Sequence, residues 1–384
     1  MKIDFCTSKR IIFGSGKFRK FPEYIEGFGS RVFIIRGNNP FYGKEFFNLI
    51  ESLKLEITYF VVDKEPDINL LLSAVKLARK NICDFVIGFG GGSVIDTGKA
   101  LAALLNNEGD LMDYLEVVGK GLSLRNPSKP YIAIPSTAGT GSEVTRNAVI
   151  DVPEKHVKVS MRNAYMLPAI ALVDPELTLD LPPRITATTG MDAFVQVIEP
   201  YVCNSPNPLV DMFCRDAIPR ALGNLLKAFH DGSDIKAREN MSWVSLLGGL
   251  SLANAKLGAV HGFAGPIGGM FHAPHGAICA SLLPAVMKVN IDNLIKNDHE
   301  CSALLRYREI SSWVTGDIKA DVRDSVQVIE ELCKELKIPR LSEMGIAKED
   351  FSTIVEKSKN SSSMKGNPVQ LTSEELIRIL ELSY

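Results

Sequence analysis

The stretch Asp84-Phe-Val-Ile-Gly-Phe-Gly-Gly-Gly-Ser93 decides the fold class of the N-terminal half. Its apolar residues predict a buried strand, and the three glycines end that strand before a stretch with helical spacing, Val94 to Leu105. Glycine lets the backbone approach a ligand closely, and a helix N-terminus offers free N–H groups and a partial positive charge. The stretch is neither a Walker A motif nor the Rossmann fingerprint, because Ala100 and Ser93 replace required residues. It favours a phosphate site over the alternative of a plain strand–helix turn.

The regions on either side of this stretch differ in their periodicity. Further strands are predicted at residues 31–36, 55–62, 131–135 and 169–173, with helices at 44–54 and 68–81 between them. This alternation indicates βαβ units and a parallel sheet. Later residues predict helices alone, at 191–201, 208–230, 235–255, 278–290, 300–314, 322–336 and 372–382. We therefore expect an α/β domain at residues 1–180 and an all-helical domain at 181–384, divided near the Leu-Pro-Pro at 181–183.

Composition excludes several classes of protein. The 384 residues include 43 Lys and Arg and 45 Asp and Glu, and the net charge of −2 disfavours a nucleic-acid binder. The seven cysteines form no C-x-x-C pair, so zinc fingers and iron–sulfur clusters are unsupported and reduced thiols in a cytosol are expected. Neither an uninterrupted membrane-spanning apolar run nor a signal peptide is recognisable, so the predicted location is the cytoplasm.

Two further segments carry candidate chemistry. Residues 134–145, Ile-Pro-Ser-Thr-Ala-Gly-Thr-Gly-Ser-Glu-Val-Thr, place hydroxyls and glycines after a predicted strand, which suits either a ligand crevice or a loop that caps itself. Three of the six histidines, His261, His272 and His275, lie in an apolar, glycine-rich segment. Asp192 and Gln196 share one face of a predicted helix and are able to reach the same ion. Imidazole with carboxylate fits zinc or ferrous iron, although satisfied core histidines are the alternative.

These segments, taken in order, resemble the iron-containing (group III) alcohol dehydrogenase family of the dehydroquinate synthase-like superfamily. The resemblance covers essentially the whole chain and is carried by the stretches at residues 12–16, 90–99, 135–143, 173–177, 190–193 and 274–276. It implies a nucleotide-binding α/β domain followed by an all-α domain. It also implies hydride transfer between NAD(P) and a small alcohol or aldehyde, at a divalent metal, Fe²⁺ or Zn²⁺, in a cleft between the domains.

The resemblance also implies residue roles. The metal ligands would be Asp192, Gln196, His261 and His275, with Asp192 also counted as catalytic. The cofactor-binding residues would be Gly37, Asn38, Gly90, Gly91, Gly92, Ser93, Asp96, Thr137, Thr140, Ser142, Thr145, Lys158 and Leu177.

The chain departs from the family pattern at two positions. Gln196 stands where the family has a histidine ligand, and an amide oxygen is a weaker ligand for zinc or iron, so we expect looser metal binding. Gly265 stands where many members have a histidine that relays the alcohol proton. His272 is the candidate we favour for that catalytic relay, while ribose hydroxyls or a water chain remain alternatives.

Cofactor choice and rival functions follow from the same comparison. NAD-preferring members often carry an acid after the first strand, where this chain reads Arg36-Gly37-Asn38, so NADP is slightly favoured. A maleylacetate reductase or a polyol dehydrogenase is the runner-up, and a nucleotide-binding protein without catalysis is the alternative of a different class. The expected partner is a small alcohol or aldehyde, with neither nucleic acid nor membrane. A homodimer is expected for such enzymes.

Overall fold

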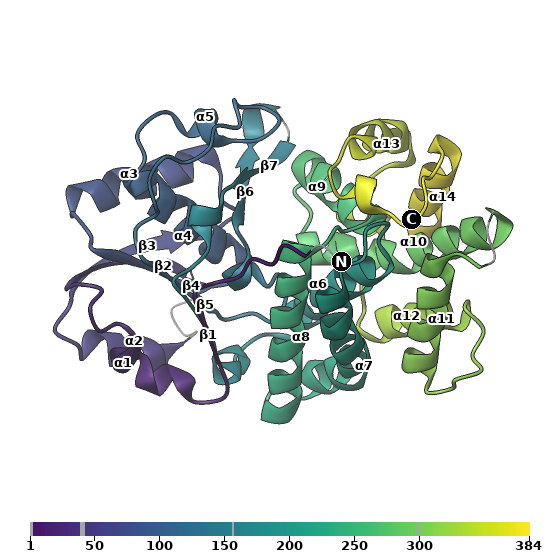
Figure 1. Cartoon of the computed structure of the whole chain (residues 1–384), viewed down its shortest axis with the longest axis horizontal. Helices are drawn as coiled ribbons and strands as arrows, with labels where there is room; N and C mark the ends of the chain where they lie inside the picture. The colour runs from purple at the N-terminus through teal and green to yellow at the C-terminus, as the bar shows by residue number, and fades with distance from the viewer. Residues whose placement is uncertain (1–2, 39–42, 156, 298–299) are drawn as a thin grey trace. The chain divides into compact units, whose positions relative to one another are not determined.

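The computed structural model describes residues 3–38, 43–155, 157–297 and 300–384. Their contacts divide the chain into two compact units, Phe5–Leu181 and a second that contains Pro182–Tyr384. Figure 1 colours Phe5–Leu181 from purple to teal and Pro182–Tyr384 from teal through green to yellow. The boundary after Leu181 coincides with the Leu-Pro-Pro sequence, where proline cannot continue a preceding helix or strand.

The first unit contains a six-stranded parallel sheet. In spatial order its strands are β1 (Arg10–Phe13), β8 (Ile170–Val173), β5 (Tyr131–Pro135), β4 (Phe85–Gly90), β2 (Arg31–Gly37) and β3 (Glu56–Val62). All five predicted strands form. The short strand β1 and the antiparallel pair β6 (Asn147–Val152) and β7 (Val157–Arg162) were not predicted. Four of them, β2, β4, β5 and β8, are apolar runs buried on both faces of the sheet, whereas Val62 is the one buried residue of the edge strand β3.

Helices cover both faces of this sheet. The helices α3 (Ile68–Lys80) and α4 (Gly92–Leu105) belong to one apolar cluster, and α2 (Lys44–Glu51) and α1 (Phe21–Tyr24) belong to another (Figure 1). The short helix α5 (Leu111–Tyr114) joins the first cluster. The chain passes from β3 across β2 to β4, so the strand order reverses between β2 and β4. Ligands of such sheets bind at the carboxyl ends of the strands at this reversal, where the glycines at residues 90–92 lie.

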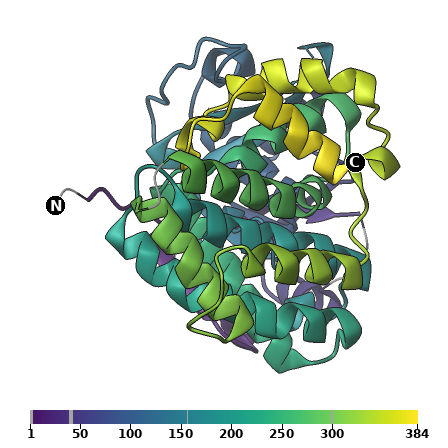
Figure 2. The same ribbon diagram turned by 90° about the vertical axis from the view of Figure 1, so that its right-hand side faces the viewer.

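The second unit is helical throughout its described residues (Figure 2). Its helices are α6 (Pro183–Val202), α7 (Pro208–His230), α8 (Ile235–Asn254), α9 (Ala259–Phe271), α10 (His275–Asn297), α11 (Ser302–Thr315), α12 (Asp324–Glu335), α13 (Phe351–Lys359) and α14 (Ser373–Ser383). The α/β fold followed by an all-α unit is therefore confirmed. Helix α6 begins earlier than predicted, with Pro183 in its first turn, where proline needs no hydrogen-bond partner. Helix α9 was not predicted, because its glycines and Pro266 disfavour a helix in isolation.

Helix α10 is long and apolar enough to span a membrane by length and composition alone. Lys288 and Asp292 interrupt its apolar residues, so the sequence does not show it as an uninterrupted apolar run. The structure buries 72% of its most apolar window inside the second unit, as expected for a core helix of a soluble protein.

Candidate active site

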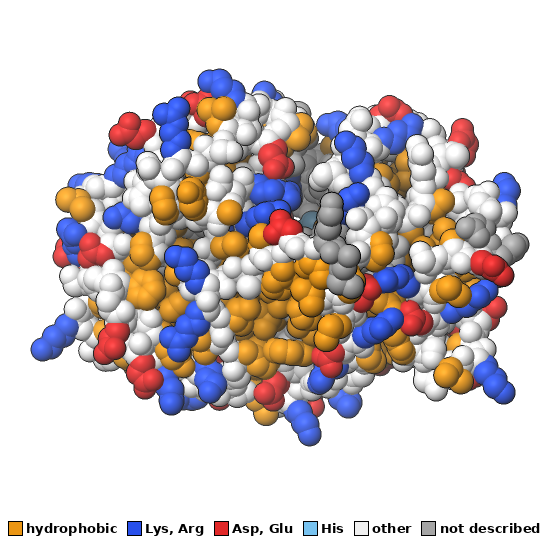
Figure 3. All heavy atoms as spheres, viewed as in Figure 1, with side chains coloured by type: hydrophobic (Ala, Val, Ile, Leu, Met, Phe, Trp, Pro, Cys, Tyr) orange, Lys and Arg blue, Asp and Glu red, His pale blue; other side chains and the backbone are white. Residues whose placement is uncertain are grey.

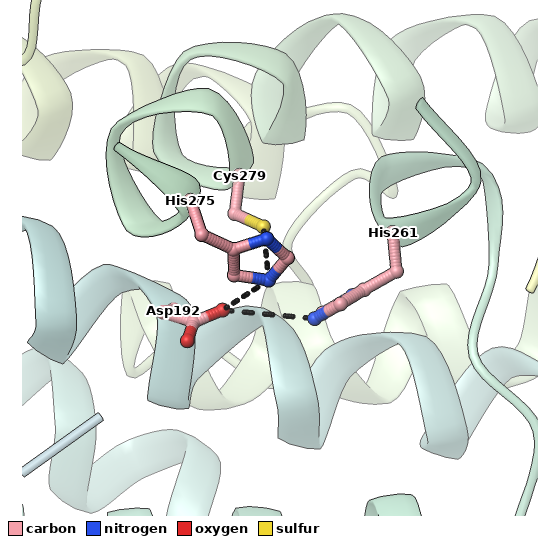
Figure 4. A group of neighbouring side chains, drawn as sticks. All are labelled: Asp192, His261, His275 and Cys279. Atoms are coloured by element: carbon pink, nitrogen blue, oxygen red, sulfur yellow. Dashed lines mark hydrogen bonds and ion pairs between the residues drawn. The ribbon is translucent and has the colours of Figure 1, made fainter. Parts of the chain in front are cut away.

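Four side chains from three helices of the second unit converge on one point (Figure 4). Asp192 comes from α6, His261 from α9, and His275 and Cys279 from the first turns of α10. The Asp192 Oδ1 atom lies 3.6 Å from His261 Nε2 and 3.7 Å from His275 Nε2. One candidate ligand atom from each of the four residues lies within 4.8 Å of those of the others. The structure therefore brings together three of the four predicted ligands and adds a thiol.

Three buried polar atoms at this point lack hydrogen-bond partners among the residues that the structure describes. They are Asp192 Oδ1, Gln196 Oε1 and His261 Nε2, and their residues are 2%, 2% and 8% exposed. Gln196, the fourth predicted ligand, lies one helical turn after Asp192 and hydrogen-bonds to its carboxylate. Buried polar atoms without partners lower the stability of the fold unless something binds them. As metal ligands, this set of nitrogen and oxygen atoms fits Fe²⁺ or Zn²⁺.

A second carboxylate orients His261. Glu199 Oε2 lies 2.7 Å from His261 Nδ1, while Glu199 Oε1 accepts the backbone N–H of Val260 at 2.7 Å. Metal-binding histidines commonly donate their other ring N–H to a carboxylate, which directs the remaining nitrogen at the ion. Glu199 thus caps the N-terminus of α9 and aims the His261 ring. Glu199 was not among the residues predicted from the sequence, although it lies on the helix that carries Asp192 and close to one turn beyond Gln196.

Burial and neighbouring charges shift the pKa values of three residues in this cluster. Burial alone would lower the pKa of His261, but its ion pair with Asp192 and its hydrogen bond and ion pair with Glu199 prevail and raise the pKa to about 9. Burial alone would raise the pKa of Asp192, but the charges of His275 and His261 and a hydrogen bond from Gln196 lower it. Burial, followed by the negative charges of Asp192 and Glu199, raises the pKa of the Cys279 thiol well above its usual value. The two carboxylates thus make the site electronegative, which suits a cation.

His272 lies outside this cluster. It is an exposed residue at the end of α9, where it adopts a left-handed conformation with φ 53°. Gly265, the other position at which the chain departs from the family pattern, has open space around it, because an added Cβ would meet nothing within 4 Å.

The glycine turn of the first unit, residues 90–92, lies against the hydroxyl-rich residues 136–145, which we call the second polar turn. An added Cβ on Gly91 would meet Thr137 at 3.4 Å, and one on Gly92 would lie only 2.7 Å from Thr140 Cγ2. The Ser136 N–H also donates to the Gly90 carbonyl at 2.9 Å. Gly91 caps α4 without any side chain to accept the first N–H groups of the helix. These groups, with Ser93 beside them, offer the donors that a pyrophosphate requires.

Polar side chains of α4, the helix that follows the glycine turn, hold the second polar turn in place. Asp96 accepts hydrogen bonds from the Ser142 hydroxyl and from the Val149 backbone N–H. The buried Lys99 ammonium donates to Thr145 Oγ1 at 2.8 Å and to the Ser142 carbonyl at 2.9 Å. Asp96, Ser142 and Thr145 thus join the two turns to each other. Lys99 was not among the predicted site residues, although its charge is fully buried.

The remaining predicted cofactor residues occupy varied positions. Gly37 ends β2, Asn38 follows it and is exposed, and the Arg36 guanidinium lies 6.0 Å from the centre of the Phe47 ring. Lys158 on β7 forms an ion pair with Glu65. Leu177 is buried in the apolar cluster that contains α1 and α2.

Comparison with known proteins gives a consistent result along the chain. Residues 8–175 match the model for iron-containing alcohol dehydrogenase, and residues 186–384 match that for the C-terminal part of the same family. Alcohol dehydrogenase 4 of Saccharomyces cerevisiae is 34% identical over 88% of this chain and 85% of its own length. The 1,3-propanediol dehydrogenase of Citrobacter freundii is 34% identical over 84% of this chain and 82% of its own.

Solved structures agree with these matches. An alcohol dehydrogenase from Oenococcus oeni superposes with a TM-score of 0.90 at 31% identity, over the full length of both chains. A 1,3-propanediol oxidoreductase superposes with a TM-score of 0.91 at 28% identity, again over both full chains. Sequence, fold and the buried donor set thus agree on a metal-dependent NAD(P) alcohol oxidoreductase, and the chain belongs to the iron-containing alcohol dehydrogenase family.

Proposed function

We propose that this enzyme interconverts a small alcohol and its aldehyde, with Asp192, His261 and His275 holding the catalytic metal and Gln196 as a further oxygen donor. The observation that carries the proposal is the set of buried donor atoms without partners in the described part of the second unit. We predict that protein purified without chelators contains close to one divalent ion per chain by elemental analysis. Metal-free protein that retains full activity would overturn this proposal.

The residues of the two units divide the work of the reaction. When bound, the dication polarises the carbonyl oxygen and stabilises negative charge on it. Asp192 and His261 fix the position of that charge, because Glu199 and the buried helices leave them little freedom. In the first unit, Gly90, Gly91, Gly92 and Ser93 bind the pyrophosphate through backbone N–H groups. Residues 1–180 thus form the cofactor-binding domain, and residues 181–384 form the domain that binds metal and substrate.

The residues of the second polar turn position the nicotinamide half of the cofactor. Thr137 and Thr140 contact the glycine turn directly. The bonds of Asp96, Ser142 and Thr145 hold the second polar turn in place. The side chains of Lys158 and Leu177 complete the cofactor site on the nicotinamide and adenine-ribose sides respectively.

His272 is the proposed proton relay for the alcohol oxygen. It is the exposed histidine at the end of the helix that carries His261, and Gly265 offers no side chain for this role. The variant His272→Ala should therefore shift the pH–rate profile. His230→Ala, which removes an exposed histidine paired with Glu335, serves as the control. An unchanged profile in His272→Ala would refute the relay.

NADP is the proposed cofactor, because no acid follows β2 to accept the ribose hydroxyls and repel a phosphate. Arg36 and Asn38 occupy that end of the strand, and Gly37 leaves space between them. We expect a higher kcat/KM for NADPH than for NADH, and Arg36→Ala should reduce the difference. Arg31→Ala, at the opposite end of β2, is the matched control. A strong preference for NADH would contradict the assignment.

The substrate class is proposed as a short alcohol or diol, by analogy with the propanediol relatives. A panel of short alcohols, aldehydes and oxoacids tests this class. Turnover confined to maleylacetate or to a polyol would favour the rival enzymes. Cofactor binding without turnover on any of these compounds would favour a protein without catalysis.

We further propose a cytoplasmic homodimer. The scattered free thiols suit a reducing compartment. Strand β1 is an edge of the sheet, and edge strands present backbone groups that can pair with another chain. Sedimentation of the purified protein should give twice the chain mass, whereas a monomer at micromolar concentration would refute the dimer.

A further inference from the structure

Cys279 has no role in the function proposed above, yet its sulfur lies among the metal-binding atoms. Cys279 follows His275 by one helical turn, so both side chains leave α10 on the same face. The Cys279 Sγ atom lies 3.6 Å from His275 Nε2 (Figure 4). Cys279 is fully buried, whereas the His275 side chain is 40% exposed, so the sulfur lies on the enclosed side of the cluster.

The spacing of these atoms matches that of ligands around one tetrahedral ion. With zinc–sulfur bonds of about 2.3 Å and zinc–nitrogen bonds of about 2.0 Å, a tetrahedral sulfur–nitrogen pair is about 3.5 Å apart. The corresponding nitrogen–oxygen separation is about 3.4 Å. The observed separations are 3.6 Å for sulfur to nitrogen, and 3.6 and 3.7 Å for the two nitrogen–oxygen pairs. The remaining three pairs are at most 4.8 Å apart, so the side chains must move inward to bring the four atoms around one cation.

An independent observation points to a ligand at this place. Asp192 Oδ1 and His261 Nε2 are buried, face the same point and have no hydrogen-bond partner in the described residues (Figure 4). Gln196, by contrast, already uses its amide N–H to bind Asp192. Gln196 therefore has a structural role whether or not its oxygen reaches the ion.

We propose that Cys279 is a further protein ligand of the metal in this chain, beside Asp192, His261 and His275, and that its thiolate compensates for the weak amide donor Gln196. The inference rests on the proposed metal-dependent function. On binding, the thiol loses its proton to solvent, and the sulfur lone pair forms the bond to the metal. The strong protein ligands are then two imidazoles, one carboxylate and one thiolate, whose two negative charges balance those of a dication.

The thiolate also changes which metal the chain prefers. Soft sulfur ligands select zinc over harder ions, whereas a set of carboxylate, amide and imidazole donors suits ferrous iron as well. We therefore expect this chain to prefer Zn²⁺ to Fe²⁺. Replacing Cys279 by alanine should weaken Zn²⁺ binding by at least the 10–100-fold that changes outside the ligand shell already cost. It should weaken Mn²⁺ binding much less, because Mn²⁺ gains little from sulfur.

Cobalt substitution tests the sulfur bond without an activity measurement. Co²⁺ bound by a thiolate shows an intense charge-transfer absorption in the near ultraviolet, whereas oxygen and nitrogen ligands alone give only weak visible bands. The full-length protein with one equivalent of Co²⁺ should show this absorption. Cys279→Ala should bind Co²⁺ and lose the absorption, and Gln196→Ala should keep it. Cys214→Ala, which removes another buried thiol of the second unit, is the control and should also keep it.

Each outcome of the cobalt experiment decides whether Cys279 binds the metal. If wild-type protein binds Co²⁺ but lacks the charge-transfer absorption, Cys279 is not a ligand, and the proposed metal-dependent function stands without it. If wild-type protein binds no Co²⁺, both the ligand assignment and the metal site are wrong. If Cys279→Ala does not fold, the wild-type spectrum still decides, because Cys279 supplies the one thiol that the described residues place within 4.8 Å of the Asp192, His261 and His275 donor atoms.

Discussion

Replacing Glu199 with glutamine should loosen the metal without removing any proposed ligand. Glu199 accepts three N–H groups, from His261 Nδ1 at 2.7 Å, from the Val260 backbone at 2.7 Å and from the His261 backbone at 3.4 Å. Glutamine has one acceptor oxygen. If that oxygen stays on the Val260 N–H, the new amide N–H takes the place of Oε2 and faces His261 Nδ1, which must then accept. The ring proton moves to Nε2, and this nitrogen can no longer bind a metal.

The size of the effect follows from this loss of orientation. Changes to groups that orient ligands cost 10–100-fold in metal affinity, which corresponds to about 1.4–2.7 kcal/mol. Competition for Zn²⁺ with a chromophoric chelator measures the dissociation constant directly. The control is Glu309→Gln, an equivalent change in the same unit, where the carboxylate binds Tyr201 and Arg215. A folded Glu199→Gln protein that loses less than about tenfold in Zn²⁺ affinity would refute the reasoning.

Three further changes probe other contacts. Gly276→Ala should lower the zinc retained after dialysis, because its Cβ would lie 2.4 Å from the Thr188 carbonyl and push α10 away from α6; full retention would show that the helices adjust freely. Gly92→Ala places a Cβ 2.7 Å from Thr140 Cγ2. Overpacking of this kind costs about 1–3 kcal/mol, so the KM for the cofactor should rise about tenfold or more. An unchanged KM would contradict the close approach of the two turns. Burial raises the pKa of Glu143 to about 7, against an ordinary 4.5, while a backbone hydrogen bond and Lys99 only partly oppose it. The folded state therefore holds the extra proton, and wild-type stability should fall as pH rises from about 4.5 to 7, by on the order of 3 kcal/mol at most. The free energy of unfolding of Glu143→Gln, measured with urea at pH 5 and pH 8, should not show this loss. An equal change in the free energy of unfolding between the two pH values in both proteins would contradict the prediction.

Much of the fold was predictable because its signals are local. The strands around Phe33, Ile87 and Ile132 are apolar on both faces, and no helical spacing competes with that pattern. Helix α14 begins with a capping box, in which Thr372 and Glu375 bind each other's backbone N–H groups. Such features require only neighbouring residues, so the sequence alone is sufficient to indicate them.

The features that were missed depend on distant parts of the chain. Helix α9 contains glycines and a proline, and its first N–H groups are capped by Glu199 on α6 and by Asn367, more than a hundred residues later. Strand β1 forms only because Ile170–Val173 lies beside it. In the site, Asp192 and His275 were recognisable by type and resemblance. Cys279 was not, because a single cysteine one helical turn after a histidine, His-x-x-x-Cys, forms no C-x-x-C pair.

The contact of Asn367 with α9 has a consequence for biosynthesis. Asn367 accepts the Ala259 N–H at 3.1 Å and exchanges amide hydrogen bonds with Asn290. The N-terminus of the helix that carries His261 is therefore complete only after residue 367 has been synthesised and has folded against it. Asp192, His261, His275 and Cys279 are all synthesised earlier, so a chain cut before Asn367 would contain all four side chains but lack one of the hydrogen bonds that hold the start of α9.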